Sequence, residues 1–413
     1  MTAGRPGVLI AGAGVAGLEA VLALRASLGD NVDITIVSPE TKFVNSSMAL
    51  NEPSKPQRRH GLALRDVASD LAARWHRGSV RNVDAERRMV VTADGIELAY
   101  DKLILAVGAR FAHPTRAKGV LTYHGRRDGP AYRLLLRQLR EGRVTKLAFI
   151  KPSGATWPLP LYDLALTTAA ECRIHGRPVE LSLITPEVEP LEMFGTSASV
   201  EIRALLKGAG IALYTSSHGA PSRPGRLHVS PGHGRLEVDR IITLPRLLGP
   251  RLLGIPLGRD GFIDIDAHGR VPGLDDVYAA GDATTLPIKQ GGLAAQQADA
   301  VAEAIAASLG VVIDPKPLQP ILRGLLLTGD AAHYFRADLD GSRTESIVSE
   351  VAQWWPPNRL CGRYLAPYLS SQVGFAADVM PQDKPSVPIG KSLDSRAAAA
   401  GRAFAELRDL PAR

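Results

Sequence analysis

Short apolar runs and helical patterns alternate from the beginning of the chain. Residues 7–11 predict a strand, residues 15–28 a helix and residues 32–37 a second strand. This order is that of a βαβ unit, which opens a parallel, doubly wound sheet. Further on we expect a helix near residues 65–75 and strands at residues 78–83, 88–91 and 102–107, with an Asp94-Gly95 turn between the last two.

The pattern of the first unit occurs a second time. Residues 32–40 (VDITIVSPE) and 179–187 (VELSLITPE) match in character at every position, and a strand at 146–151 and a helix near 161–173 precede the second copy. Chance similarity of two strand ends is the alternative. We therefore expect an α/β fold with two Rossmann-like domains, the second inserted in the first, and a C-terminal cap. The predicted boundaries are 1–115 and 236–312 for the first domain, 116–235 for the second and 313–413 for the cap, with the chain returning to the first domain at about residues 240–244.

Three glycines connect the first strand to its helix in the order G-x-G-x-x-G. Gly12 would make the tight turn, Gly14 would let the backbone approach a pyrophosphate, and Gly17 would let strand and helix pack closely. The helix N-terminus then presents free N–H groups and a partial positive charge to the phosphates. The motif predicts a bound dinucleotide, and an unliganded glycine-rich turn is the alternative.

A second motif identifies the dinucleotide. The apolar segment that begins at Val277 ends in Gly281-Asp282, so its carboxylate reaches the carboxyl edge of the sheet. There Asp282 can accept hydrogen bonds from the ribityl hydroxyls of a flavin, which an NAD-only protein would not need. Another apolar strand ends at Gly108, at the same edge. We predict FAD, held non-covalently because no histidine or cysteine tether is evident.

Other predicted FAD contacts follow from position. Ser38, Pro39 and Glu40 lie about where a ribose-binding acid is expected. Lys289 and Gln290 precede a helix at residues 291–309, whose first turn should point at the flavin ring and stabilise its anionic reduced form; a solvent-facing Lys289 is the alternative. The predicted set comprises Gly12, Ala13, Gly14, Val15, Ala16, Gly17, Ser38, Pro39, Glu40, Ala106, Val107, Gly108, Gly281, Asp282, Lys289, Gln290, Gly291 and Gly292.

The second copy lacks the glycine motif. After its first strand the chain reads KPSGATWPLP over residues 151–160, with a single glycine. Proline supplies no N–H group, and Trp157 would block the approach of a phosphate. We therefore expect the second domain to bind NAD(P)H poorly or not at all.

The composition narrows the functional classes to which the protein can belong. The formal charge of +7 comes from arginines scattered along the chain, so we expect no nucleic-acid partner. No apolar run is long enough for a membrane span, and we expect a cytoplasmic protein with at most peripheral membrane contact. The two cysteines, Cys172 and Cys361, form no Cys-x-x-Cys motif, which disfavours a dithiol reductase. We predict no metal site.

The C-terminal region is distinctive in its aromatic residues and prolines. Residues 354–368 read WWPPNRLCGRYLAPY. Plain core packing is the favoured interpretation, and a cap over the flavin or a homodimer contact are the alternatives. Residues 395–410 predict an amphipathic helix that packs on its own protein rather than on a membrane.

Taken together, the glycine motif, residues 100–109 and residues 277–282 resemble the two-dinucleotide-fold flavoproteins that include the pyridine nucleotide-disulfide oxidoreductases. The resemblance covers residues 5–310 and implies FAD held by Gly12, Gly14, Gly17, Gly108 and Asp282, with the backbone of Val80 near the adenine. The chain is most similar to sulfide:quinone oxidoreductases and flavocytochrome c sulfide dehydrogenases, then to type II NADH dehydrogenases. Sulfide:quinone oxidoreductases carry a cysteine pair beside the flavin, which the matching residues 153–158 and 325–329 lack.

The leading functional hypothesis is an FAD-dependent oxidoreductase that passes electrons from a small donor to a quinone-like or other acceptor. An NAD(P)H:acceptor oxidoreductase and a non-catalytic flavin-binding partner subunit are the alternatives. No side chain is a convincing acid or base, because the cofactor carries the chemistry. The weak catalytic candidates are Lys289, Tyr162 and Cys361, with His113 and His124 candidates by residue type alone.

Overall fold

The first unit of the fold is a five-stranded parallel sheet. The computed structural model describes residues 4–44, 61–113, 117–329, 331–339, 346–357 and 359–372. The sheet has the order β20-β9-β1-β2-β5, formed by Val277–Ala279, Lys102–Leu105, Gly7–Ala11, Asp33–Ser38 and Arg74–Arg77. β1, β2 and β9 lie where the apolar runs predicted them.

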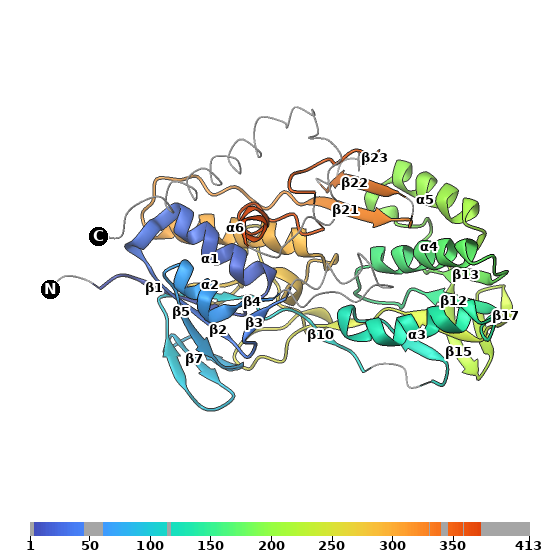
Figure 1. The fold of residues 1–413 in the computed structure, drawn as a ribbon. Coiled ribbons are helices and arrows are strands. Elements are labelled where there is room, and N and C mark those ends of the chain that lie inside the picture. Colours follow the sequence, from blue (N-terminus) through green and yellow to red (C-terminus); the bar gives the residue numbers. More distant parts are fainter. Residues whose placement is uncertain are drawn as a thin grey trace.

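Helices cover one face of this sheet and a small antiparallel sheet covers the other. α1 (Val15–Leu28) packs against α6 (Gly291–Ser308), and both bury apolar side chains over the strands, as the left half of Figure 1 shows. The opposite face carries β6 (Val80–Asp84), β7 (Met89–Thr92) and β8 (Glu97–Ala99). The Asp94-Gly95 turn therefore leads into β8, a short strand that the sequence analysis did not predict.

The predicted helix at residues 65–75 is only partly correct. α2 covers Leu64–Asp70, and the chain then turns through Ala72, whose φ is +48°, into β5. Trp75 lies opposite Ile36 in the parallel sheet. Sheet pairing with β2 thus overrides a local pattern that reads as helical.

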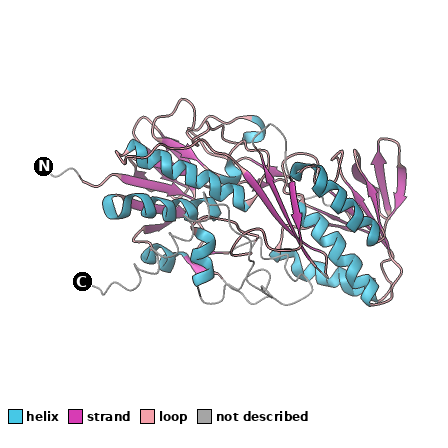
Figure 2. Cartoon of the chain, turned by 90° about the horizontal axis from the view of Figure 1, so that it is seen from above, coloured by secondary structure: helices cyan, strands magenta, loops and turns pink. Residues whose placement is uncertain are grey.

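The second unit repeats the first. Its parallel sheet has the order β11-β18-β12-β13-β14, formed by Val120–Thr122, Arg240–Thr243, Lys146–Ile150, Glu180–Ile184 and Ile211–Tyr214. The accompanying elements are α3 (Gly129–Arg140), α4 (Leu159–Ile174), α5 (Thr196–Gly208) and the antiparallel sheet β15 (His218–Arg223), β16 (Arg226–Ser230) and β17 (Gly234–Glu237). This small sheet lies at one end of the molecule, on the right in Figure 2.

The return to the first unit comes later than predicted. β18 pairs with both β11 and β12, so residues 240–243 belong to the second sheet and not to the first. Their apolar pattern fits either sheet, and only the pairing partners decide between them. The chain leaves the second unit after Thr243.

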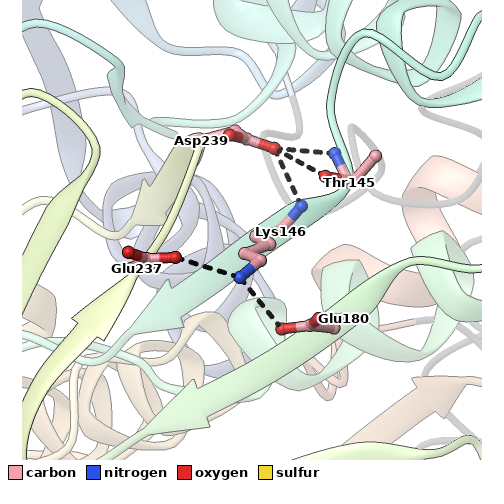
Figure 3. Close-up of polar contacts among 5 residues, drawn as sticks. All are labelled: Thr145, Lys146, Glu180, Glu237 and Asp239. Atoms are coloured by element: carbon pink, nitrogen blue, oxygen red, sulfur yellow. Dashed lines mark hydrogen bonds and ion pairs between the residues drawn. The ribbon is translucent and has the colours of Figure 1, made fainter.

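Strand register shows that the repeat is structural and not a chance similarity. Gly7 lies opposite Asp33 in the first sheet, and Lys146 lies opposite Glu180 in the second. An aspartate precedes β9 in the first sheet and β18 in the second. Asp101, before β9, accepts a hydrogen bond from the Gly7 N–H at 2.6 Å. Asp239 accepts from the N–H groups of Thr145 and Lys146 at 2.8 and 3.0 Å (Figure 3).

A C-terminal layer lies between the two units. β21 (Ile321–Leu327), β22 (Ala332–Asp338) and β23 (Ser346–Ser349) form an antiparallel sheet that contacts α6 of the first unit and α4 and α5 of the second, as the orange and red strands of Figure 1 show. Two-stranded pairs complete the fold: β3 (Lys42–Phe43) with β4 (Leu62–Ala63), and β10 (Arg110–Phe111) with β19 (Leu247–Leu248). None of the described helices is long and apolar enough to cross a membrane.

The last described segment comprises residues 359–372, and we call it the strap. Leu360, Leu365 and Tyr368 join the core of the first unit, which agrees with the core-packing interpretation of this region. The strap includes α7 (Leu365–Ser371), and the carboxylate of Glu19 on α1 accepts hydrogen bonds from the N–H groups of Tyr364 and Leu365 at 2.7 and 2.8 Å. The predicted helix at residues 395–410 lies outside the described residues.

Candidate functional site

A cavity of about 840 Å³ lies at the carboxyl ends of the first sheet. It has the size of a cofactor or substrate site. Its walls come from the first unit, the second unit and the C-terminal layer. The position agrees with the rule that ligands of parallel α/β sheets bind beyond the carboxyl ends of the strands.

The glycine turn after β1 has a backbone conformation that other residues avoid. Gly12 has φ +115°, and a Cβ there would lie 2.2 Å from the carbonyl oxygen of Ala106. A Cβ on Gly17 would lie 2.0 Å from the carbonyl oxygen of Gly12, so Gly17 serves the packing of helix on strand. A Cβ on Gly14 would meet no atom within 4 Å, because Gly14 faces the cavity.

The N-terminus of α1 is open toward the same space. α1 begins at Val15, and no side chain caps it. The N–H groups of its first turn therefore keep their hydrogen-bonding capacity for a ligand, and the helix dipole favours an anionic one. Val15 and Ala16 also line the cavity.

Asp282 lines another part of the cavity wall. No described group donates a hydrogen bond to its carboxylate. Burial raises the pKa of Asp282, and the neighbouring Lys289 opposes that rise. Gly281 beside it has φ +81°, and its N–H donates to Oε1 of Gln297 at 2.5 Å. A desolvated carboxylate without donors suits a ligand that carries several hydroxyl groups.

The residues before α6 are held in place by hydrogen bonds. Lys289 is 4% exposed, its Nζ donates to the carbonyl oxygen of Thr284 and lies 3.8 Å from the centre of the Phe262 ring. Burial lowers the pKa of Lys289 to about 8. The solvent-facing alternative for Lys289 is therefore wrong. Gln290 caps α6 by accepting from the Leu293 N–H at 2.9 Å, and its Nε2 donates to the carbonyl oxygen of Arg323 at 3.3 Å.

The end of β2 forms a further section of the wall. Ser38 is buried, and its Oγ accepts a hydrogen bond from the N–H of Glu40 at 3.3 Å. Glu40 is exposed at the cavity wall, and Val80 also lines the cavity. An acid and a hydroxyl in this position suit a ribose.

Most of the predicted FAD contacts meet around this one cavity. Gly17 and Gly292 do not line it. A Cβ on Gly292 would lie 2.9 Å from Oε1 of Gln290 and 3.5 Å from Cβ of Cys361, so this glycine makes room for the cap of α6. The lining residues from the predicted set are Gly12, Ala13, Gly14, Val15, Ala16, Ser38, Pro39, Glu40, Val80, Ala106, Val107, Gly108, Gly281, Asp282, Lys289, Gln290 and Gly291.

Side chains outside the first unit also line the cavity, and the sequence analysis did not assign them to it. Asp163 on α4 accepts a hydrogen bond from the Leu327 N–H and pairs with Nη1 of Arg359, both at 2.7 Å. Asp163 and Arg359 lie 196 positions apart in the sequence, and no motif connects them. Tyr123, Trp157 and Arg323 are further members of this group.

The weak catalytic candidates differ in position. Tyr162 is fully buried beneath the cavity wall, where its hydroxyl donates to Oε2 of Glu187 at 2.7 Å. Cys361 lies behind Gly292, Cys172 is buried in α4, and His113 is exposed; none of them lines the cavity. His124 does line it, and its Nδ1 lies 3.0 Å from the carboxylate of Asp128.

Side chains of the second unit cover the carboxyl end of its strand β13. Glu187 is 5% exposed and accepts hydrogen bonds from Tyr162 at 2.7 Å and from Thr185 at 2.6 Å. Trp157 packs against Phe194, with ring centres 6.0 Å apart. The acid at the end of β13 thus binds neighbouring side chains of its own unit.

Comparisons with known proteins agree with this geometry. Residues 6–150 match the family model described as pyridine nucleotide-disulphide oxidoreductase. An NADH dehydrogenase-like protein of Mycobacterium tuberculosis is 28% identical over 304 residues, which cover 67% of this chain and 72% of the relative.

Among solved structures, the sulfide:quinone oxidoreductase of Aquifex aeolicus superposes with a TM-score of 0.75 at 18% identity, covering 84% of this chain and 87% of that one. A ferredoxin reductase of Rhodopseudomonas palustris gives a TM-score of 0.62 at 19% identity, covering 81% and 83%. The family match and the shared fold support the same assignment. They support the pyridine nucleotide-disulphide oxidoreductase superfamily, whose model matches residues 6–150 of this chain.

Proposed function

We propose that this protein holds one non-covalent FAD and passes electrons from a small donor to a quinone-like or other small acceptor. The observation that carries the proposal is that the glycine turn after β1 and the carboxylate of Asp282 face one cavity. The two cysteines, Cys172 and Cys361, are free thiols, which suits a reducing compartment, and we propose the cytoplasm.

The residues present fit FAD along the whole cavity. The open N-terminus of α1 would bind the pyrophosphate, since no protein side chain caps it. Asp282 would accept from the ribityl hydroxyls, and Ser38 with Glu40 would bind the ribose. When bound, FAD supplies the two-electron chemistry.

The protein's own part in the reaction is electrostatic. Lys289 has a pKa of about 8 and is therefore mostly protonated at neutral pH. Its buried positive charge and the N-terminus of α6 would stabilise negative charge that develops at this end of the cavity. Among the acid-base candidates, the hydroxyl of Tyr162 already donates a hydrogen bond to Glu187, and we therefore assign no proton transfer to Tyr162.

The test is a spectrum of the purified protein followed by a donor panel under anaerobic conditions. We expect a flavin absorption band with one FAD per chain, released by denaturation, and bleaching of that band by one of NADH, NADPH, sulfide, small thiols or reduced quinones. A colourless protein that takes up no added FAD would contradict the proposal. Bound FAD that no donor reduces would favour a non-catalytic partner subunit.

NADH is the second candidate donor, because the mycobacterial relative is described as NADH dehydrogenase-like. Against it stand the prolines and Trp157 after β12 and the buried state of Glu187. Rapid mixing with NADH distinguishes the two: we expect slow or absent bleaching. Rapid bleaching at low NADH would show that the nicotinamide enters despite the closed strand end of the second unit.

A further inference from the structure

A second cavity, of about 170 Å³, lies at the amino ends of β11 and β18. Its lining comes from residues 117–119, from the end of the β15–β16 hairpin and from residues 238–241. The carboxyl ends of the same two strands lead into the large cavity, which Tyr123 and Leu244 line. The small cavity is therefore separate from the large one, at the opposite ends of β11 and β18.

Cationic side chains from three segments of the chain line the small cavity. We call them the basic cluster, which consists of Lys118, Arg223, Arg226 and Arg240. Among the described residues, no carboxylate forms an ion pair with any of these four side chains. By contrast, Arg203 of the same unit pairs with Glu189 at 2.7 Å, and Lys146 pairs with Glu237 at 3.2 Å. The cations of the basic cluster thus keep their charge for a ligand.

The pairing of the hairpin brings two of these charges face to face. Regular pairing would place Ser222 opposite Arg226, but a register shift after Pro221 places Arg223 there instead. Gly225 lies in the turn between the two arginines, and its φ of +81° fits the third position of a type II turn. Like charges directly opposite each other destabilise an antiparallel pair. A bound anion would convert this repulsion into attraction.

The carboxylate of Asp239, which also lines the small cavity, is directed away from the basic cluster. Its Oδ2 accepts hydrogen bonds from the N–H groups of Thr145 and Lys146 at 2.8 and 3.0 Å (Figure 3). Arg240 donates to the carbonyl oxygen of Asp239 at 2.8 Å, and not to its carboxylate. Four cations and one carboxylate among the lining residues leave an excess of three positive charges. Such an excess suits a dianion better than a monoanion.

We propose that the basic cluster binds a phosphate monoester group. Such a group carries about −1.5 to −2 charges at neutral pH and three acceptor oxygens. It can therefore accept hydrogen bonds from guanidinium groups on both strands of the hairpin at once. The small volume suits one anionic group rather than a dinucleotide. This site is independent of the proposed flavin function.

Calorimetric titration of the FAD-saturated protein with inorganic phosphate at pH 8 tests the proposal. The ionic strength is low and held constant, because salt screens exposed charges. We expect a Kd of about 1 mM for phosphate and binding of acetate, a monoanion, that is at least about tenfold weaker. No heat of binding up to about 20 mM phosphate, or equal binding of acetate, would overturn the proposal.

Single-charge variants locate the binding site. Arg223→Gln and Arg226→Gln should each weaken phosphate binding by about fivefold or more. Both arginines are exposed, and removal of either charge relieves their repulsion, so neither variant should unfold at a lower temperature than the parent protein.

A matched control lies in the same three-stranded sheet. Arg235 on β17 lies opposite His228 of β16 and does not line the small cavity. Arg235→Gln removes the same charge and should leave the phosphate affinity unchanged. Equal losses of affinity in Arg223→Gln and Arg235→Gln would show attraction by overall charge and would overturn the site.

Two further probes distinguish the sources of the phosphate group. Glycerol phosphate represents a free ester, and vesicles that contain phosphatidate represent a lipid headgroup. Binding of either probe that Arg223→Gln weakens and Arg235→Gln does not supports the site and identifies the source. Binding of neither would overturn it.

The outcomes also separate this site from the proposed function. If the protein takes up no FAD, the proposed function fails. Arg223 and Arg226 do not line the large cavity, so the comparison of Arg223→Gln with Arg235→Gln still decides whether the basic cluster binds phosphate.

Discussion

The two Rossmann-like units share a register and use the same positions in opposite ways. The residue after the first strand donates its N–H to the neighbouring strand in both: Gly12 to Val37 at 2.7 Å, and Lys151 to Ile184 at 2.9 Å. Only Gly12 has a positive φ and backbone atoms where a Cβ would be. The first unit thus packs backbone against backbone at this position, whereas the second accepts an ordinary side chain there.

The acids at the ends of β2 and β13 show the same contrast. Glu40 is exposed at the wall of the cavity, while Glu187, its match in the repeat, is buried under Tyr162 and Thr185. A shared sequence pattern therefore establishes a shared strand, not a shared binding site. What differs is the set of side chains that the flanking helix places over the strand end.

The largest effect is expected from the turn after β1. Gly12→Ala should lower the free energy of unfolding by about 3 kcal/mol, because the Cβ would meet the carbonyl of Ala106 at 2.2 Å. Lys151→Ala, the matched change in the second unit, should change it by less than about 0.5 kcal/mol. Chemical denaturation of both variants measures the difference, and equal losses would remove the contrast between the units.

Gly14→Ala separates folding from ligand binding at the same turn. The added methyl group meets no protein atom within 4 Å, so the stability of the flavin-free protein should stay unchanged. FAD binding should still weaken, because the methyl group enters the space that the pyrophosphate needs. Flavin fluorescence on titration gives the affinity, and an unchanged affinity would argue against a pyrophosphate at this turn.

Asp282→Asn should weaken FAD binding about 30-fold, roughly 2 kcal/mol, because a charged acceptor of hydroxyl groups is lost. The flavin-free protein should not be destabilised, since burial disfavours the Asp282 carboxylate and raises its pKa. Glu237→Gln removes one charge at the far side of the second unit, beside Lys146 (Figure 3), and serves as the control. A similar affinity in both variants would mean that Asp282 does not contact the flavin.

Tyr162→Phe tests how the second unit closes its strand end. Burial raises the pKa of Glu187, and the hydrogen bond from Tyr162 opposes that rise. Because the hydrogen bond from Tyr162 stabilises the ionised form of Glu187, the variant should lose about 1 to 3 kcal/mol of stability at pH 8 and less near pH 5, where the protonated form is more populated.

The control for this change lies in the same unit. Tyr132 is equally buried, and its hydroxyl lies 2.7 Å from the neutral Oγ1 of Thr168. Tyr132→Phe should therefore give a loss of stability that is the same at pH 5 and pH 8. If the loss of stability in Tyr162→Phe were also the same at pH 5 and pH 8, Glu187 would have to stay protonated over this range.

The smallest effect is expected at Glu40. Its side chain is exposed to solvent, so Glu40→Gln should weaken FAD binding by no more than about threefold. Titration at low and high salt measures it. A loss above tenfold would mean that the strand end of the first unit contributes as much as Asp282.

The sequence was most informative where a local pattern determines the structure. The positions of β1, α1 and α6 follow from apolar spacing and from the glycines and Gln290 at their ends. Trp75 and residues 240–243 were assigned wrongly, because their strand partners are distant in sequence. The contribution of Asp163 and Arg359 to the cavity depends on the docking of the strap, which no periodicity encodes.

A carboxylate at the same helix position in each unit binds the strap. Glu19 is the fifth residue of α1 and Asp163 the fifth of α4, and each buried carboxylate binds the C-terminal region. Rotating one unit against the other would expose or unpair one of these charges. The contacts of the strap with both units therefore oppose a hinge opening between them.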